Sequence, residues 1–267
     1  MNKPIFILGA HKSGSSLLRS LLDGHPSLFT IPLELHMFRA AGYWVDYRLT
    51  ESRPSELLLS EASQAYLSIV EQYNARHKPL SDANLVGKFD MEKVREYLCR
   101  PKHSFSELAE GYVHAVHAGL HGMEMPEHLR IVEKSVENAE FVLDLKAMYP
   151  DAKFLHIVRN PYAHLVSLRL MHAQHSGRRF PFLGKLIESL NNSTYHLYRN
   201  NRLIRDYMVV RYEDLLIQPM QMMKQVADFL EIEFNDILVM PTSLGQKWQG
   251  NSSRGVKVCW HFCGKCC

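Results

Sequence analysis

The run IFILGAHKSGSS, residues 5–16, decides the fold of this chain. Its first four residues are all apolar, which predicts a buried β-strand over residues 5–8. The leucine-rich stretch that follows the run predicts a helix from about Ser16 to Asp23. Gly9 and Gly14 lie between these two elements, where they free backbone N–H groups to wrap an anion at the N-terminus of the helix. The run therefore predicts a phosphate-binding loop between a strand and a helix.

This loop is similar to the Walker A pattern, G-x4-G-K-[ST], but differs from it at one position. Ser15 follows the second glycine, where Walker A loops carry the lysine that reaches the β- and γ-phosphates, and the lysine of this loop is Lys12. The displacement argues against hydrolysis of ATP or GTP. A structural turn rich in glycine and serine is the alternative interpretation of this segment taken alone. The candidate anion ligands are Lys12, Ser13, Gly14, Ser15 and Ser16.

Strand and helix patterns alternate through much of the chain. Residues 153–158 and 207–211 predict strands, and residues 219–230 predict a helix. Strands that alternate with helices indicate a parallel sheet that is covered on both faces. The sequence therefore predicts an α/β fold of the P-loop NTPase-like type.

Local signals predict where several helices begin. Asn160-Pro161 predicts the N-cap and first residue of one helix. Ser135 predicts the N-cap of an earlier helix, which contains Phe141, Leu145 and Met148 and ends by Pro150. Ser104 and Glu107 have the spacing of a capping box, which opens a further helix.

The domain organisation predicted from these patterns is a single domain over residues 1–255. Residues from about 50 to 125 have helical patterns without clear strands, and we expect them to form an insertion over the ligand edge of the sheet. Residues 256–267 are an atypical tail, because the sequence there is rich in cysteine and matches no helical pattern.

The composition is that of a globular protein and excludes several classes. The chain has 267 residues, of which 46% are hydrophobic and 22% are charged, so it can bury a core. Its net charge of +3 is far below the basic excess of nucleic-acid-binding proteins. No apolar run approaches the ~20 residues that span a bilayer, and the apolar start is too short for a secretory signal. We expect no nucleic-acid partner and no transmembrane segment.

The cysteines favour a reducing, cytoplasmic location. Apart from Cys99, they are crowded into the last nine residues as Cys259, Cys263, Cys266 and Cys267, whereas a disulfide framework spreads cysteines along the chain. The spacing in the tail matches no paired zinc knuckle, so we expect no metal site. A zinc- or redox-responsive interaction protein is an alternative that rests on this tail alone.

Arg159 and Ser167 predict a second anion site. Arg159 follows the strand over residues 153–158, at the carboxyl end where open α/β sheets bind ligands, and Ser167 lies about two turns into the next helix. An arginine and a hydroxyl that converge in this way can hold a phosphate. Together with the first loop, they predict a ligand with two separated anionic groups.

These motifs resemble those of the sulfotransferase family. Residues 12–16 are similar to the family's 5′-phosphosulfate loop, and Arg159 and Ser167 are similar to its 3′-phosphate motif, with the same step of eight residues. Other similarities follow in family order: Glu133-Lys134-Ser135 to an E-K-[ST]-P segment in which Val136 replaces the proline, residues 210–215 to V-x-Y-E-D-L, and residues 250–253 to an N-S-S loop. The resemblance runs from Gly9 to about Ser253, and its style is that of bacterial and tyrosylprotein sulfotransferases.

The resemblance implies transfer of a sulfuryl group from 3′-phosphoadenosine 5′-phosphosulfate to a hydroxyl or amine, without a metal. It implies that Lys12 holds the 5′ end of this donor and that Lys134 stabilises charge on the transferred group. Tyr212 and Ser252 lie on segments that match donor-binding segments of the family. A tyrosine packed in the core is an equally good interpretation of Tyr212.

Two side chains compete for the role of the catalytic base. Glu34 matches the segment in which tyrosylprotein-type enzymes carry a catalytic glutamate, and a desolvated cleft can raise the pKa of such a group toward neutrality. His36 is the rival, because the ordinary pKa of histidine already suits the role and cytosolic sulfotransferases use a histidine. We favour Glu34.

Other functions remain open on the sequence alone. A P-loop kinase of a small molecule would share the fold but would need a lysine at the position of Ser15. A catalytically silent nucleotide-binding relative is the other alternative, favoured by the atypical tail. The acceptor is a small molecule, carbohydrate, lipid or peptide, and the sequence does not indicate an oligomeric state.

Overall fold

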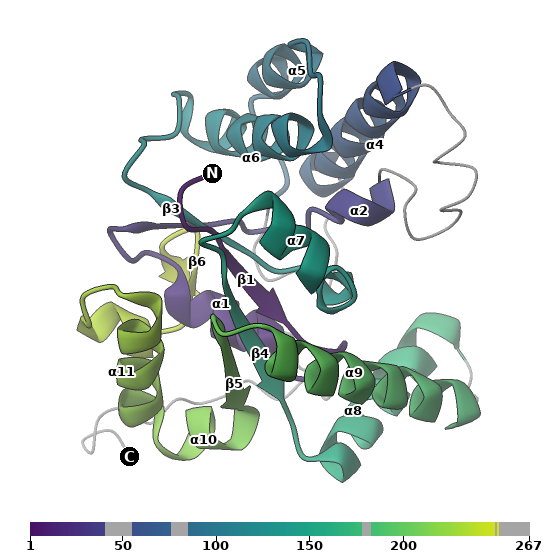
Figure 1. Ribbon diagram of the computed structural model, residues 1–267, viewed down its shortest axis with the longest axis vertical. Helices are drawn as coiled ribbons and strands as arrows, with labels where there is room; N and C mark the ends of the chain where they lie inside the picture. The colour runs from purple at the N-terminus through teal and green to yellow at the C-terminus, as the bar shows by residue number, and fades with distance from the viewer. Residues whose placement is uncertain (41–54, 76–84, 178–182, 249, 251–267) are drawn as a thin grey trace.

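The computed structural model describes residues 1–40, 55–75, 85–177, 183–248 and 250, so Ser252 and the tail over residues 256–267 lie outside the described residues. Its centre is a sheet of five parallel strands in the order β2-β3-β1-β4-β5 (Figure 1). These strands are β1 Ile5–Leu8, β2 Leu28–Thr30, β3 Arg130–Glu133, β4 Lys153–Val158 and β5 Tyr207–Arg211. Because all five strands run in the same direction, the loops that follow them meet at one edge of the sheet.

One face of the sheet is covered by helices from both ends of the chain. They are α1 (Ser15–Leu22), α10 (Tyr212–Ile217) and α11 (Pro219–Leu230). Ile5 and Ile7 of β1 pack into a buried cluster with the leucines of α1 and with Val226 of α11. The turn η2 (Asp236–Val239) and the hairpin of β6 (Thr242–Ser243) and β7 (Gln246–Lys247) pack beside α1.

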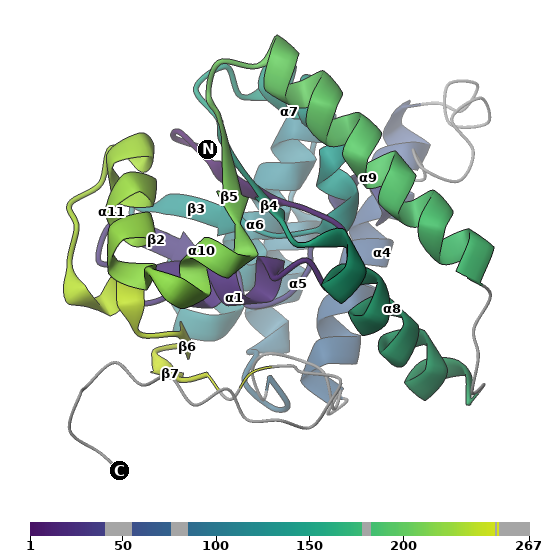
Figure 2. The ribbon, with the colours of Figure 1, turned by 90° about the horizontal axis from the view of Figure 1, so that it is seen from below.

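The other face is covered by the middle of the chain. Phe6 and Leu8 of β1 pack there with residues of α4 (Ser55–Ala75), α5 (Met91–Cys99), α6 (Phe105–His121) and α7 (Val142–Met148). Alternate residues of β1 therefore enter two separate cores, as expected for a strand buried on both faces. Two further helices, α8 (Pro161–Ser176) and α9 (Leu183–Leu203), pack against each other and extend away from the sheet (Figure 2).

Most of the predicted elements form where the sequence placed them, and the predicted α/β class is confirmed. β4, β5 and α11 have the predicted bounds, and α1 begins one residue earlier than expected. Asn160 caps α8, since its Oδ1 atom accepts hydrogen bonds from the backbone N–H groups of Tyr162 and Ala163. The capping box also forms: Ser104 Oγ accepts from Glu107 N at 3.2 Å. Within the described residues, no helix is both long and apolar enough to cross a membrane.

The prediction that Ser135 caps a helix is wrong. Ser135 is followed by the 3-10 turn η1 (Val136–Ala139), and α7 begins only at Val142. The reason is competition for the hydroxyl oxygen: Ser135 Oγ accepts a hydrogen bond from His36 N at 3.1 Å instead of from the turn, while it donates to the carboxylate of Glu133 at 2.5 Å. A backbone N–H group of the loop after β2 has therefore taken the acceptor that a local cap would use.

The helical insertion packs on the face of the sheet as well as near its ligand edge. Its helices α4, α5 and α6 contribute to the same core as Phe6 and Leu8. α4 also contacts the short helix α2 (Met37–Ala40), where Tyr66 Oη donates to the carbonyl oxygen of Met37 at 2.9 Å. Because α2 follows β2 through the loop at the carboxyl edge, this contact links α4 to the edge where the sequence predicts the ligand site.

Gly9→Ala tests how tightly the loop after β1 is held. Gly9 has a φ of +142°, and an added Cβ would lie 2.7 Å from the carbonyl oxygen of Ile157. Gly122 is the matched control, since its φ is +72° and no atom lies within 4 Å of its added Cβ. We expect Gly9→Ala to lower the free energy of unfolding by about 2–4 kcal/mol and Gly122→Ala by about 1 kcal/mol. Urea denaturation measures both, and equal losses would contradict the steric argument.

Candidate active site

The loop after β1 has the backbone of an anion cradle. Lys12 and Gly14 have positive φ values of 67° and 110°, which helps to turn backbone N–H groups toward one side. Ser15 and Ser16 are the first residues of α1, so the loop ends at a helix N-terminus. The Oγ atom of Ser13 is buried and has no hydrogen-bond partner among the described residues. A buried donor without a partner in such a cradle fits an anionic ligand.

Arg159 and Tyr212 close this loop from the ends of β4 and β5. Arg159 Nη1 donates to the carbonyl oxygen of Lys12 at 3.2 Å, and the guanidinium carbon lies 4.6 Å from the centre of the Tyr212 ring. The same ring packs against Gly14 so closely that any Cβ there would collide with it. The Nε atom of Arg159 is buried and has no partner among the described residues. Tyr212 therefore packs over the loop, and Arg159 keeps a donor that a ligand can use.

Ser167 lies half-buried in the second turn of α8. Three residues before it, His164 Nε2 donates to the carbonyl oxygen of His11 in the loop at 2.7 Å. Residues three apart on a helix share a face, so Ser167 belongs to the side of α8 that faces the loop. The structure thus brings Lys12, Arg159 and this side of α8 together.

Glu34 and Lys134 form an ion pair beside the loop. Lys134 Nζ donates to Glu34 Oε1 at close range, and only 4% of Lys134 is exposed. The other oxygen, Glu34 Oε2, lies 3.6 Å from His36 Nε2, and His36 Nδ1 is 2.6 Å from Glu137 Oε1. His11 of the loop interacts electrostatically with this cluster, so the two halves of the site adjoin. The positive charge that faces the carboxylates comes from Lys134 and His36.

Glu133, the last residue of β3, organises this cluster. Its carboxylate is fully buried, and Oε1 accepts from Leu35 N at 3.3 Å and from Ser135 Oγ at 2.5 Å. Its second oxygen, Oε2, accepts from Asn138 Nδ2. Ser135 Oγ accepts in turn from His36 N at 3.1 Å. Glu133 therefore ties the loop after β2 to the turn after β3.

Burial and charge shift three pKa values in the cluster. Burial acts to raise the pKa of Glu34, but the ion pair with Lys134, aided by the charge of His36, lowers it to about 2. Burial acts to lower the pKa of His36, but the hydrogen bond and the charge of Glu137 raise it above its ordinary value. Burial raises the pKa of Glu133 to about 7, against hydrogen bonds that favour the ionised form.

Sequence reasoning missed two parts of this site. Glu137 has no motif of its own, and it lies 101 residues from His36, so no spacing rule connects the pair. Glu133 lies in the segment that resembled the family pattern, yet nothing in the sequence indicated that its carboxylate would hold the neighbouring loop.

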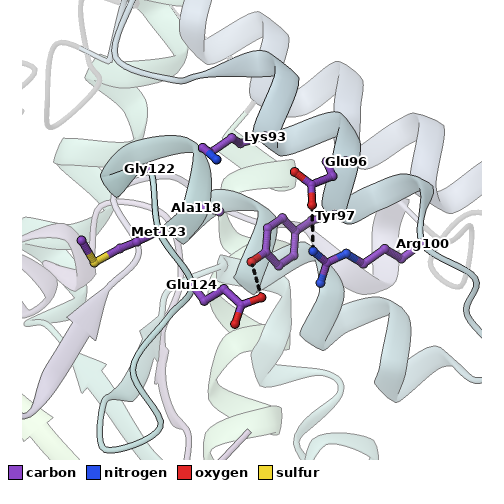
Figure 3. A pocket seen from close by; sticks show the side chains of 8 residues that line it. All are labelled: Lys93, Glu96, Tyr97, Arg100, Ala118, Gly122, Met123 and Glu124. Carbon is purple, nitrogen blue, oxygen red and sulfur yellow. Dashed lines mark hydrogen bonds and ion pairs between the residues drawn. The ribbon is translucent and has the colours of Figure 1, made fainter.

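A hollow of about 210 Å³ lies away from this cluster, between α5 and the end of α6 (Figure 3). Its polar groups bond to one another: Tyr97 Oη donates to Glu124 Oε1 at 3.1 Å, and Arg100 Nη2 donates to Glu96 Oε1 at 2.9 Å. The residues that line it are Lys93, Glu96, Tyr97, Arg100, Ala118, Gly122, Met123 and Glu124. None of the predicted site residues is among them, so the candidate chemistry belongs to the sheet edge.

Comparison with known proteins gives the family of this chain. A model of the sulfotransferase family matches residues 4–236. The chain belongs to the sulfotransferase family. No curated protein matches it.

Solved sulfotransferase structures share the fold at low sequence identity. The sulfotransferase domain from the curacin biosynthetic pathway is 21% identical, with a TM-score of 0.61 over 94% of this chain and 81% of that chain. The sulfotransferase domain of the Synechococcus PCC 7002 olefin synthase is 21% identical, with a TM-score of 0.58 over 92% and 81%. A sulfotransferase from Alicyclobacillus acidocaldarius is 18% identical, with a TM-score of 0.51 over 87% and 83%.

Membership in the sulfotransferase family gives the reaction class that the sequence motifs implied. The chain is a sulfotransferase-family enzyme, and the donor of this family is 3′-phosphoadenosine 5′-phosphosulfate. The expected reaction class is confirmed, and the kinase alternative is set aside.

Glu133→Gln tests the buried carboxylate through the pH dependence of stability. The pKa of Glu133 is about 7 in the native state against 4.5 as the ordinary value, so between these values the native state binds more protons than the unfolded state. The contribution of Glu133 to stability therefore falls as pH rises through this window. Glutamine does not titrate, so we expect the variant to gain about 3 kcal/mol relative to the wild type across it.

Urea unfolding of both proteins across this pH range measures the effect. Glu127→Gln is the control, because Glu127 is exposed in the turn before β3 and its replacement removes the same charge. A difference between Glu133→Gln and the wild type that stays constant with pH would contradict the assignment.

Proposed function

We propose that this sulfotransferase binds its donor between the loop after β1 and Arg159, and transfers the sulfuryl group to a hydroxyl or amine held beside Glu34. The observation that carries the proposal is the position of the Lys134–Glu34 ion pair next to the anion cradle, at the carboxyl edge of a parallel sheet. The loop after β1 and Arg159 suit a nucleotide with two anionic ends. The Lys134–Glu34 pair offers a cation and a carboxylate for the transfer itself.

The residues of the donor half fit such a nucleotide. Lys12 and residues 13–16 would hold the 5′ end, where Ser13 Oγ is a buried donor without a partner among the described residues. Arg159 and Ser167 would hold the 3′-phosphate, and the Nε atom of Arg159, which has no partner in the described part of the chain, supports this role. Tyr212 would keep the loop in place, since its ring already packs on Gly14 and lies beside Arg159. Ser252, which we also assign to the donor, lies outside the described residues.

The transfer half divides its work between Lys134 and Glu34. When bound, the donor supplies the sulfuryl group: a bond forms between the acceptor oxygen or nitrogen and sulfur, and the bond from sulfur to the 5′-phosphate oxygen breaks. Lys134 would stabilise the charge on the group in transfer, and Lys12 would neutralise the leaving phosphate. Glu34 would take the proton of the acceptor.

The ion pair between Lys134 and Glu34 determines when Glu34 can act as a base. While Lys134 remains on Glu34, the carboxylate is ionised but weakly basic, because its pKa is about 2. When Lys134 turns toward the sulfuryl group, the cation recedes from Glu34 and the pKa of that carboxylate rises. Glu34 would therefore become an effective base only when the donor is in place.

The acceptor and the location of the enzyme complete the proposal. A small molecule, carbohydrate, lipid or peptide that presents a hydroxyl or amine is the acceptor class, and no nucleic-acid partner is expected, given the net charge of +3. We also propose a cytoplasmic location, which rests on the distribution of cysteines along the sequence.

Arg159→Ala tests the 3′-phosphate site. We expect the variant to lose ~10–100-fold in affinity for 3′-phosphoadenosine 5′-phosphate, because a charge-assisted hydrogen bond contributes ~1.5–3 kcal/mol. Binding of adenosine 5′-phosphosulfate, which lacks the 3′-phosphate, should change much less. Calorimetry with both ligands measures the difference, and Arg202→Ala on α9, an exposed arginine, serves as the control. Equal losses for the two ligands would remove Arg159 from this site.

Glu34→Gln tests the base. The substitution keeps the shape of the side chain and removes its charge, so we expect donor affinity to survive while kcat falls ~10²–10⁴-fold. Single-turnover measurements at saturating donor separate the two effects. A variant with normal turnover would show that Glu34 is not the base, and the role would then pass to His36.

A further inference from the structure

A buried carboxylate outside the predicted site residues contacts the candidate catalytic cluster. Only 4% of the Glu137 side chain is exposed, and its Oε1 atom lies 2.6 Å from His36 Nδ1. On the other side of the ring, His36 Nε2 lies 3.6 Å from Glu34 Oε2. The ring of His36 therefore bridges a buried carboxylate and the proposed base.

We propose that Glu137 is a positioning residue that holds the His36 ring with Nε2 toward Glu34, so that His36 carries away the proton that Glu34 takes from the acceptor. This inference rests on the proposed function. It gives Glu137 no contact with substrate, since its action passes through His36.

The hydrogen bond to Glu137 selects the form of the ring that the relay needs. A carboxylate only accepts hydrogen bonds when it is ionised, so His36 Nδ1 must carry the proton in this contact. In the neutral ring the lone pair then lies on Nε2, the atom that faces Glu34. The backbone adds to this orientation, because His36 N donates to Ser135 Oγ at 3.1 Å and holds the residue at a φ of +51°.

The proton that Glu34 takes from the acceptor reaches water without any other reactant. Glu34 gains the acceptor proton during transfer and must lose it before the next turnover. The proton passes from Glu34 Oε2 to His36 Nε2, the resulting imidazolium is balanced by Glu137, and Nε2 then releases the proton to water. The 24% exposure of the His36 side chain gives water access to it.

The charged groups around His36 come from four segments. Glu34 lies on the same loop, Glu137 on η1 and Glu133 at the end of β3, and all three carboxylates act to raise the pKa of His36. His11 reaches the cluster from the loop after β1. Lys134 faces Glu34 and limits how far that carboxylate favours the imidazolium.

Glu137→Gln separates positioning from a structural role. Glutamine keeps an oxygen for His36 Nδ1 but removes the charge, so we expect the pKa of His36 to fall by about one unit or more. NMR titration of ¹⁵N-histidine-labelled protein, bound to 3′-phosphoadenosine 5′-phosphate, measures this pKa and the tautomer directly. If His36 in the wild type is not protonated on Nδ1 when neutral, or if its pKa is the same in both proteins, the proposal is wrong.

Turnover gives the second readout, with an acceptor found by screening phenols, alcohols and amines against the wild type. Since neutral His36 is the active form, the acidic limb of the kcat profile should move to lower pH in Glu137→Gln, with kcat reduced ~10-fold. Glu127→Gln, which removes an exposed carboxylate before β3, should leave the limb in place. A reduced rate without a shift of the limb would mean that Glu137 is only structural.

A double-mutant cycle with His36→Asn completes the test. On that background Glu137→Gln should change kcat less than twofold, whereas a full additive loss, or normal turnover by His36→Asn alone, would overturn the proposal. Failure of the wild type to bind 3′-phosphoadenosine 5′-phosphate would instead refute the proposed function. His36→Asn with its own pH profile also tests the relay if Glu137→Gln does not fold.

Discussion

The buried carboxylate of Glu133 is the constraint on which the catalytic half of this site depends. It ends the strand next to β1 and accepts hydrogen bonds from Leu35, Ser135 and Asn138. Burial of a charge is costly, as the pKa of about 7 indicates, and these three donors offset the cost only in this geometry. The loop that carries Glu34 and His36 is therefore held to the turn that carries Glu137. The hydrogen bonds of Glu133 thus set the distances among these three side chains, although we propose no chemical role for Glu133 itself.

The donor half depends on a different constraint, which is the close packing of backbone. Gly9 approaches the carbonyl oxygen of Ile157 on β4, and Gly14 lies against the ring of Tyr212, so neither position has room for a Cβ. Arg159 then fastens the loop through the carbonyl oxygen of Lys12. Residues at the ends of β4 and β5 thus shape the loop that follows β1. Because the cradle is made of backbone and the transfer cluster of side chains, each half can be perturbed by substitution without dismantling the other.

The sequence predicts the features of this structure that depend on residues close in the chain, and it does not predict the contacts between residues far apart in the chain. β1, β4, β5, α11 and the Asn160 cap follow from patterns of residues close in the chain, and these were predicted correctly, whereas β2 and β3 were not predicted. Ser135 has the same local signal as Asn160, but its hydroxyl oxygen accepts from His36 N, so the local rule failed where a donor distant in the chain took the acceptor. The contact between His36 and Glu137 joins residues 101 apart, and only the sheet order brings them together. The residue types of the site were visible in the sequence, whereas the pairing among them was not.

The charge balance of the cluster supports the proposal that Glu34 is the base. Without ligand, the carboxylates of Glu34 and Glu137 face Lys134 and His36, so the charges of the transfer half are already compensated. The anionic ends of the donor must then be met mainly by the loop and by Arg159, which retain buried donors without protein partners among the described residues. An acceptor group that approaches Glu34 meets a carboxylate, which disfavours an anion at that point and favours a neutral hydroxyl or amine. In the proposed mechanism, such a group loses its proton most readily once Lys134 has moved from Glu34 to the sulfuryl group. Deprotonation of the acceptor would therefore depend on the presence of the donor.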